Sequence, residues 1–151
     1  MNITQIKLSF SNAYLVRGHK TILVDTGMPG EEDKINRPFP AVTPDLLLDN
    51  AFDLSSFGVE GCILPTPGHT TGSIALLLAD GTAVVGDVMV GGVMGGALFG
   101  ARPNYHYFAE DVTAVQSSIR SLLAAGVQTF YVGHGGPLRC ADVEKRFAGT
   151  A

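Results

Sequence analysis

The segment from Pro65 to Asp87, PTPGHTTGSIALLLADGTAVVGD, constrains the fold of this chain more than any other. Its two apolar runs are joined by Asp80-Gly81, a dipeptide that is typical of the tight turn between antiparallel strands. His69 precedes the first run, and Asp87 directly follows the second. The two side chains are therefore expected at the same edge of a sheet. Because strand ends hold ligands rigidly, the hairpin predicts part of a metal or active site.

The remaining sequence predicts a mixture of short strands and two helices. Alternating apolar residues and turn signals predict strands at 6–10, 13–17, 21–25, 73–78, 82–85 and 128–132, with further short strands within 45–64. Helices are predicted at 110–125, where apolar residues recur at helical spacing, and at 141–147. Segment 88–101 (VMVGGVMGGALFGA) is expected to form a flexible, apolar, glycine-rich loop or a self-association surface. Its GxxxG pairs leave a membrane helix as an alternative.

Three residues share one placement, because His69, Asp87 and His134 each lie at a predicted strand end beside a glycine. Imidazole and carboxylate groups are suitable zinc ligands, so these three are the candidate metal ligands. Asp25 also follows a predicted strand, and it either bonds its own turn or points into the site. His106 lies between two tyrosines and is either a packed surface residue or a substrate contact. Asp25, His106 and Thr70 are therefore the candidates to support the ion or the substrate.

The sequence resembles the metallo-β-lactamase superfamily, and most of all its glyoxalase-II-like hydrolases. The resemblance lies in NAYLVRGHKTILVDTGMPG, in LPTPGHTTGSIALLL with AVVGDVM, and in FYVGHGGP. It implies an α+β fold, an αββα sandwich of two mixed sheets with a metal site along one sheet edge. In that superfamily the counterparts of His69 and His134 bind separate ions, and the counterpart of Asp87 bridges the two.

The superfamily motif HxHxDH is absent, since no histidine lies between His19 and His69. Residues 28–44 form a proline-rich irregular link in its place, as if an internal deletion were joined near Pro29-Gly30-Glu31. We therefore expect residues 1–151 to form one reduced domain that lacks strands and helices of the N-terminal half. The resemblance implies that four metal ligands are lost and that three remain, divided between two sites.

Three functions are compatible with this sequence. The first is a self-associating or binding protein with an incomplete metal site and no hydrolase activity. The second is a metal-dependent hydrolase with a reduced single-ion site made by His69, Asp87 and His134, holding at most one zinc, iron or manganese ion. The third is a membrane-associated protein that uses the glycine-rich segment.

Partner and location follow from composition. Only 16% of the residues are charged, and a deletion would uncover apolar sheet surface, so a homodimer or a higher homo-oligomer is expected. The net charge of −4 argues against a nucleic-acid partner. The first ten residues lack a signal-peptide pattern. Cys62 and Cys140 match no CxxC pattern and are expected to be reduced, which favours a cytoplasmic protein.

Overall fold

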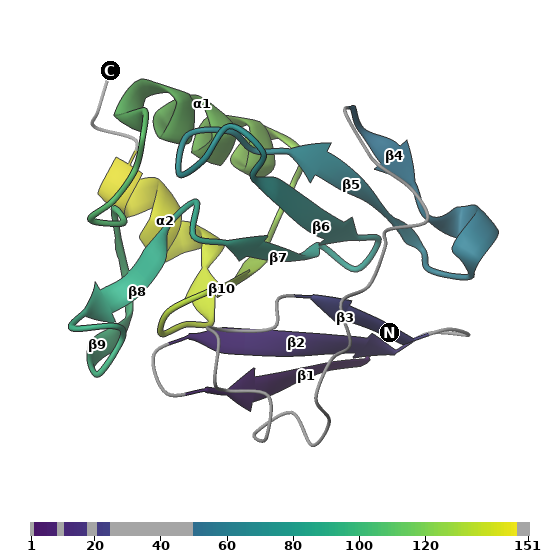
Figure 1. Ribbon diagram of the computed structural model, residues 1–151, viewed down its shortest axis with the longest axis horizontal. Coiled ribbons are helices and arrows are strands. Elements are labelled where there is room, and N and C mark those ends of the chain that lie inside the picture. Colours follow the sequence, from purple (N-terminus) through teal and green to yellow (C-terminus); the bar gives the residue numbers. More distant parts are fainter. Residues whose placement is uncertain (1, 9–10, 18–20, 25–49, 148–151) are drawn as a thin grey trace.

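The computed structural model describes residues 2–8, 11–17, 21–24 and 50–147, which form three layers (Figure 1). A small sheet lies on one face of a larger sheet, and two helices cover the other face. Asp25 and the link at 28–44 lie outside the described residues. So does the rest of 25–49, which lies in the region where the superfamily would carry its HxHxDH motif.

The small sheet is an antiparallel meander in the order β1-β2-β3, as the sequence predicts. Its strands are β1 (Asn2–Lys7), β2 (Asn12–Arg17) and β3 (Thr21–Val24). Tyr14 and Val16 on β2 are almost fully buried and pack against apolar side chains of the larger sheet. Burial of this apolar face joins the first two layers.

The larger sheet has the order β11-β10-β7-β6-β5-β4. Its strands are β4 (Phe52–Asp53), β5 (Gly61–Pro65), β6 (Ile74–Leu78), β7 (Thr82–Gly86), β10 (Thr129–Val132) and β11 (Leu138–Arg139). The sheet is mixed, because β10 pairs with β7 in parallel and the other described neighbours pair antiparallel. The hairpin predicted around Asp80-Gly81 is confirmed as β6 and β7. A short 3-10 turn at Ser55–Phe57 follows β4.

Segment 88–101 does not form the flexible loop predicted from its glycines, and it does not form a helix. It makes most of an antiparallel pair, β8 (Val90–Val93) and β9 (Leu98–Asn104). A Cβ atom at Gly91 would overlap the backbone of Gly100, so this glycine permits close approach of two strands. Among the described residues, no helix has the length and apolar character needed to cross a bilayer.

The two helices pack on the larger sheet. α1 (Val112–Ala124) begins at Asp111, whose carboxylate accepts a 3.0 Å hydrogen bond from the backbone N–H of Ala114. Gly126, in the left-handed region at φ 83°, follows the end of this helix. α2 (Cys140–Phe147) closes the described chain and buries Val143. Side chains from both helices and from β7 and β10 form one continuous core.

Candidate metal centre

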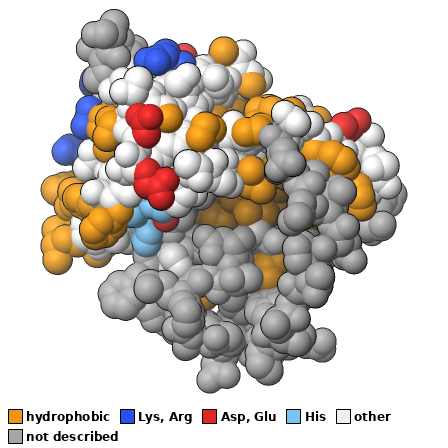
Figure 2. All heavy atoms as spheres, turned by 45° about the horizontal axis from the view of Figure 1, so that its top comes forward, with side chains coloured by type: hydrophobic (Ala, Val, Ile, Leu, Met, Phe, Trp, Pro, Cys, Tyr) orange, Lys and Arg blue, Asp and Glu red, His pale blue; other side chains and the backbone are white. Residues whose placement is uncertain are grey.

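Three histidines surround one aspartate at the edge of the larger sheet. The His134 Nε2 lies 3.5 Å from Asp87 Oδ2, and the His106 Nε2 lies 3.8 Å from the same oxygen. The rings of His69 and His106 meet edge to face with centroids 4.5 Å apart, and those of His106 and His134 are 5.5 Å apart. Figure 2 shows histidine side chains beside acidic ones at the surface of the molecule. The cluster is therefore reachable from solvent.

The loop that carries His69 is fixed to the start of α1. The backbone N–H of Asp111 donates to the Gly68 carbonyl at 2.9 Å, and that of Glu110 donates to the His69 carbonyl at 3.2 Å. Gly68 has φ +133°, and a Cβ atom there would overlap the backbone of Val115. The glycine before His69 thus allows the loop to touch the helix, which holds the histidine in place.

Asp87 follows β7, and its carboxylate is only partly exposed. Its Oδ1 atom is buried and finds no hydrogen-bond partner among the described residues. Gly133 lies directly against this carboxylate, since a Cβ at position 133 would overlap it. A buried carboxylate oxygen without a hydrogen bond is costly unless it binds a cation. The donor set therefore fits a metal ion.

The charge states of the cluster suit a cation. Burial raises the pKa of Asp87, but the hydrogen bond and charge of His134, with the charges of His106 and His69, bring it below its ordinary value. Burial lowers the pKa of His106, and the nearby Asp87 only partly opposes this shift. The cluster thus favours an ionised carboxylate beside a neutral imidazole at His106, which are the forms that bind metal ions.

His134 is held where three segments meet. Its carbonyl accepts a 2.7 Å hydrogen bond from the N–H of Gly91, and the carbonyl of Gly133 accepts a 2.7 Å bond from the N–H of Asn12. The Asn12 side chain also donates to the carbonyls of Val132 and Gly135, at 2.9 and 3.0 Å. The sequence reasoning missed Asn12, which looks like an ordinary turn residue. Its role depends on contacts about 120 residues away along the chain.

The structure gives His106 a more central place than the sequence suggested. The ligand atoms of His69, Asp87 and His106 all lie within 4.8 Å of one another. His134 contacts Asp87 but is not part of that mutually close set. The backbone N–H of Phe108 donates to the His106 Nδ1 at 3.2 Å, which favours a proton on Nε2 when the ring is neutral. A metal ion at Nε2 would therefore require this hydrogen bond to break.

Thr70 acts within its own loop. Its hydroxyl lies 3.0 Å from the Ser73 hydroxyl, and its backbone N–H donates to the same Ser73 oxygen at 3.2 Å. The side chain is exposed. These bonds close the loop that carries His69, so Thr70 shapes that loop.

A cleft of about 490 Å³ opens beside His134. Lys7 at the end of β1 and Leu8 after it line one part of the cleft, and Met94 in the glycine-rich turn between β8 and β9 lines another. Its volume is within the range of small-molecule sites. A substrate in this cleft would lie next to His134.

Comparison with known proteins places the fold. No protein-family model matches the sequence, and no curated protein matches it. Among solved structures, the BLEG-1 B3 metallo-beta-lactamase matches over 97% of this chain and 98% of its own, with a TM-score of 0.67 and 15% identity. A metallo beta lactamase from Erythrobacter litoralis matches over 97% and 85%, with a TM-score of 0.60 and 19% identity.

A metallo-beta-lactamase family protein from Thermus thermophilus is 25% identical, with a TM-score of 0.50. The match covers 81% of this chain but only 40% of that protein, so the chain spans less than half of its length. The fold of this chain is that of the metallo-β-lactamases in reduced form, which confirms the resemblance at the level of the fold.

Proposed function

We propose that this chain binds one transition-metal ion through His69, Asp87 and His106. His134 lies beside this site and donates a hydrogen bond to the Asp87 carboxylate. The observation that carries the proposal is the 4.8 Å limit within which the three ligand atoms lie. Two imidazoles and a carboxylate suit zinc, iron or manganese. His106 thereby offsets part of the ligand loss that the missing motif implies.

The proposal extends to hydrolysis with a reduced single-ion site. A catalytic zinc site typically has three protein ligands and an open position, and His69, Asp87 and His106 meet that number. A divalent ion held by them would act as a Lewis acid toward a carbonyl or phosphoryl group. His134 lines the cleft and contacts Asp87, so it can hold or transfer a proton beside a bound substrate. Lys7 in the same cleft favours substrates that carry an anionic group.

A cobalt titration tests the metal site. Metal-depleted protein is expected to bind about one equivalent of Co²⁺, with visible absorption from a site that contains histidine. His106→Gln should weaken binding about tenfold or more, whereas Asp80→Asn, an exposed carboxylate on the β6–β7 turn, should leave it unchanged. Equal affinity in His106→Gln and wild type would exclude His106 as a ligand.

Activity is tested separately with thioester, lactam and phosphodiester model substrates. Metal-loaded protein is expected to hydrolyse one of these classes, and His134→Gln should lower the rate more than it lowers metal affinity. Stoichiometric metal binding without hydrolysis of any class would refute the hydrolase proposal. It would leave the metal site itself standing.

A second candidate, a self-associating protein, is favoured by exposed apolar side chains. Met94, Leu98 and Phe108 are 73%, 50% and 78% exposed on the β8–β9 hairpin and the loop that follows it. Met94 also has a positive φ of 54°, which is strained for a residue with a side chain. We propose that a second copy of the chain covers this surface.

Light scattering at micromolar concentration tests this candidate. The wild type is expected to be a dimer, and Met94→Ser combined with Phe108→Ser should give monomers. Phe57→Ser, which alters an exposed ring in the 3-10 turn, is the matched control. A monomeric wild type would refute the proposal.

A further inference from the structure

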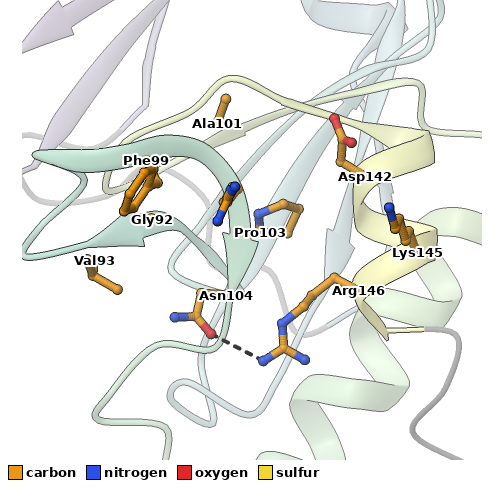
Figure 3. Close-up of a pocket in the computed structure, with 10 residues that line it drawn as sticks. Gly92, Val93, Phe99, Ala101, Pro103, Asn104, Asp142, Lys145 and Arg146 are labelled. Atoms are coloured by element: carbon orange, nitrogen blue, oxygen red, sulfur yellow. Dashed lines mark hydrogen bonds between the residues drawn. The ribbon is translucent and has the colours of Figure 1, made fainter.

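A second pocket, of about 570 Å³, lies between β9 and α2 (Figure 3). None of the four residues of the candidate metal centre lines it. Arg102 comes from β9, and Lys145 and Arg146 come from α2. Figure 3 shows the Arg146 side chain reaching toward Asn104, with Asp142 and Lys145 along the same helix. The pocket is therefore a basic site separate from the histidine cluster.

The charge of this pocket opposes that of the whole chain. The chain carries a net charge of −4 and has ten Lys and Arg residues, of which three line the pocket. Asp142 is the one carboxylate among the lining residues, so the lining has a net charge of +2. Among the described residues, no carboxylate lies within 4.0 Å of any of these three cations. No described carboxylate therefore competes with a ligand for their charge.

Basic residues at a helix end have a simpler explanation, because cations stabilise the C-terminal end of a helix dipole. Lys145 and Arg146 lie in the last turn of α2 and fit that explanation. Arg102 does not, since it comes from the strand across the pocket. The helix dipole therefore explains Lys145 and Arg146. It does not explain why Arg102, from another strand, lines the same pocket as these two residues.

The two guanidinium groups are held in position. Arg146 Nη2 donates to the Asn104 Oδ1 at 3.3 Å, and its guanidinium lies 5.5 Å from the Tyr105 ring centroid. The Arg102 guanidinium lies 4.8 Å from the Phe99 ring centroid. Such contacts with aromatic rings limit the freedom of long side chains. A ligand that binds here meets cations that are already partly ordered, which reduces the entropic cost of binding.

We propose that this pocket binds a small phosphomonoester with an apolar or aromatic body. A phosphate group carries a charge of about −1.5 to −2 at pH 7, which matches the +2 of the lining better than a single carboxylate does. Guanidinium groups bind phosphate oxygens with paired hydrogen bonds. Val93, Phe99 and Pro103 line the same pocket and provide the surface for the organic part. The volume is within the range of small-molecule sites.

Calorimetric titration of the full chain with phenyl phosphate tests the proposal. A chelator is present, so that phosphate cannot bind through an ion at the histidine cluster. Phenyl phosphate should bind with a stoichiometry near one, and more tightly than benzoate or inorganic phosphate. Absence of binding at millimolar concentration, or tighter binding of benzoate, would overturn the proposal.

Variants locate the bound ligand. Arg102→Gln and Arg146→Gln should each weaken phenyl phosphate binding about tenfold or more, as loss of a charge-assisted hydrogen bond predicts. Arg120→Gln, on the exposed face of α1, is the matched control and should bind as the wild type does. If either pocket variant lowers the melting temperature, Lys145→Gln on the exposed side of α2 gives a second measurement. Equal affinity in the pocket variants and in Arg120→Gln would place the ligand elsewhere.

Discussion

Gly133→Ala is the substitution expected to weaken metal binding at the site most while changing the stability of the fold least. The added Cβ would lie 3.0 Å from Asp87 Cγ and closer still to Oδ1, whereas ordinary contact begins at 3.4 Å. The carboxylate must therefore move by about half an ångström or more. A functional site generally needs its groups placed to within about that distance. We expect metal affinity to fall about 10- to 100-fold, the usual effect of disturbing the support of a ligand.

The same substitution should change stability little. The backbone of Gly133 is not in the left-handed region, so alanine adds no strain of that kind there. Replacing glycine by alanine at a permitted position stabilises a protein by roughly 0.4–1 kcal/mol through the unfolded chain, which offsets part of the cost of the displaced carboxylate. The free energy of unfolding of metal-free protein should therefore stay within about 1 kcal/mol of the wild type.

Metal affinity by calorimetry and stability by urea unfolding together make the assay. Gly72→Ala is the matched control, since a Cβ at Gly72 would meet nothing within 4 Å although this residue is in the His69 loop. The control should retain wild-type affinity. If Gly133→Ala binds metal as tightly as Gly72→Ala does, the carboxylate of Asp87 is not a ligand and the reasoning fails.

Three further predictions concern the metal-free protein. Gly68→Ala should lower the free energy of unfolding, measured by urea unfolding, by about 1–2 kcal/mol or more, because it forces a positive φ on alanine and its Cβ overlaps Val115. The control is Gly72→Ala. Equal stability of the two variants would contradict the account. Phe130→Ala should cost about 3–5 kcal/mol in the same assay, since the ring is fully buried, and a loss below about 1 kcal/mol would be inconsistent with that burial. The pKa of His106 is lower in the folded protein than in the unfolded chain, so neutral His106 stabilises the fold above its ordinary pKa of about 6.5. This stabilisation is lost as the pH falls from about 6.5 through the lower pKa of the folded state. His106→Gln should therefore reduce the difference in stability between about pH 7.5 and about pH 5.5, and an unchanged difference would count against this assignment.

The parts of the fold that sequence predicted best are those set by local signals. Asp80-Gly81 specified the β6–β7 hairpin because a tight turn between antiparallel strands depends mainly on the turn residues. The spacing of Val115, Ile119 and Leu122 specified α1, and all three are buried in its core-facing side. Strand β11 was missed because two residues carry no periodicity.

The site could be predicted only in part. His69, Asp87 and His134 stood out because each adjoins a glycine at a strand end. His106 was predicted as a supporting residue and not as a ligand, because its approach to Asp87 depends on how β8 and β9 return the chain, and the glycines of that hairpin suggested flexibility. Gly91 instead allows two backbones to touch. Such tertiary convergence has no counterpart in local sequence.

Elemental analysis of the protein, purified without chelator, tests the central claim most directly. The account predicts close to one equivalent of zinc, iron or manganese per chain in the wild type. His69→Ala combined with His106→Ala should lose that metal while α1 and the β-sheets keep their circular dichroism signal. A wild type purified in this way without stoichiometric metal, or a double variant that retains it, would contradict the account.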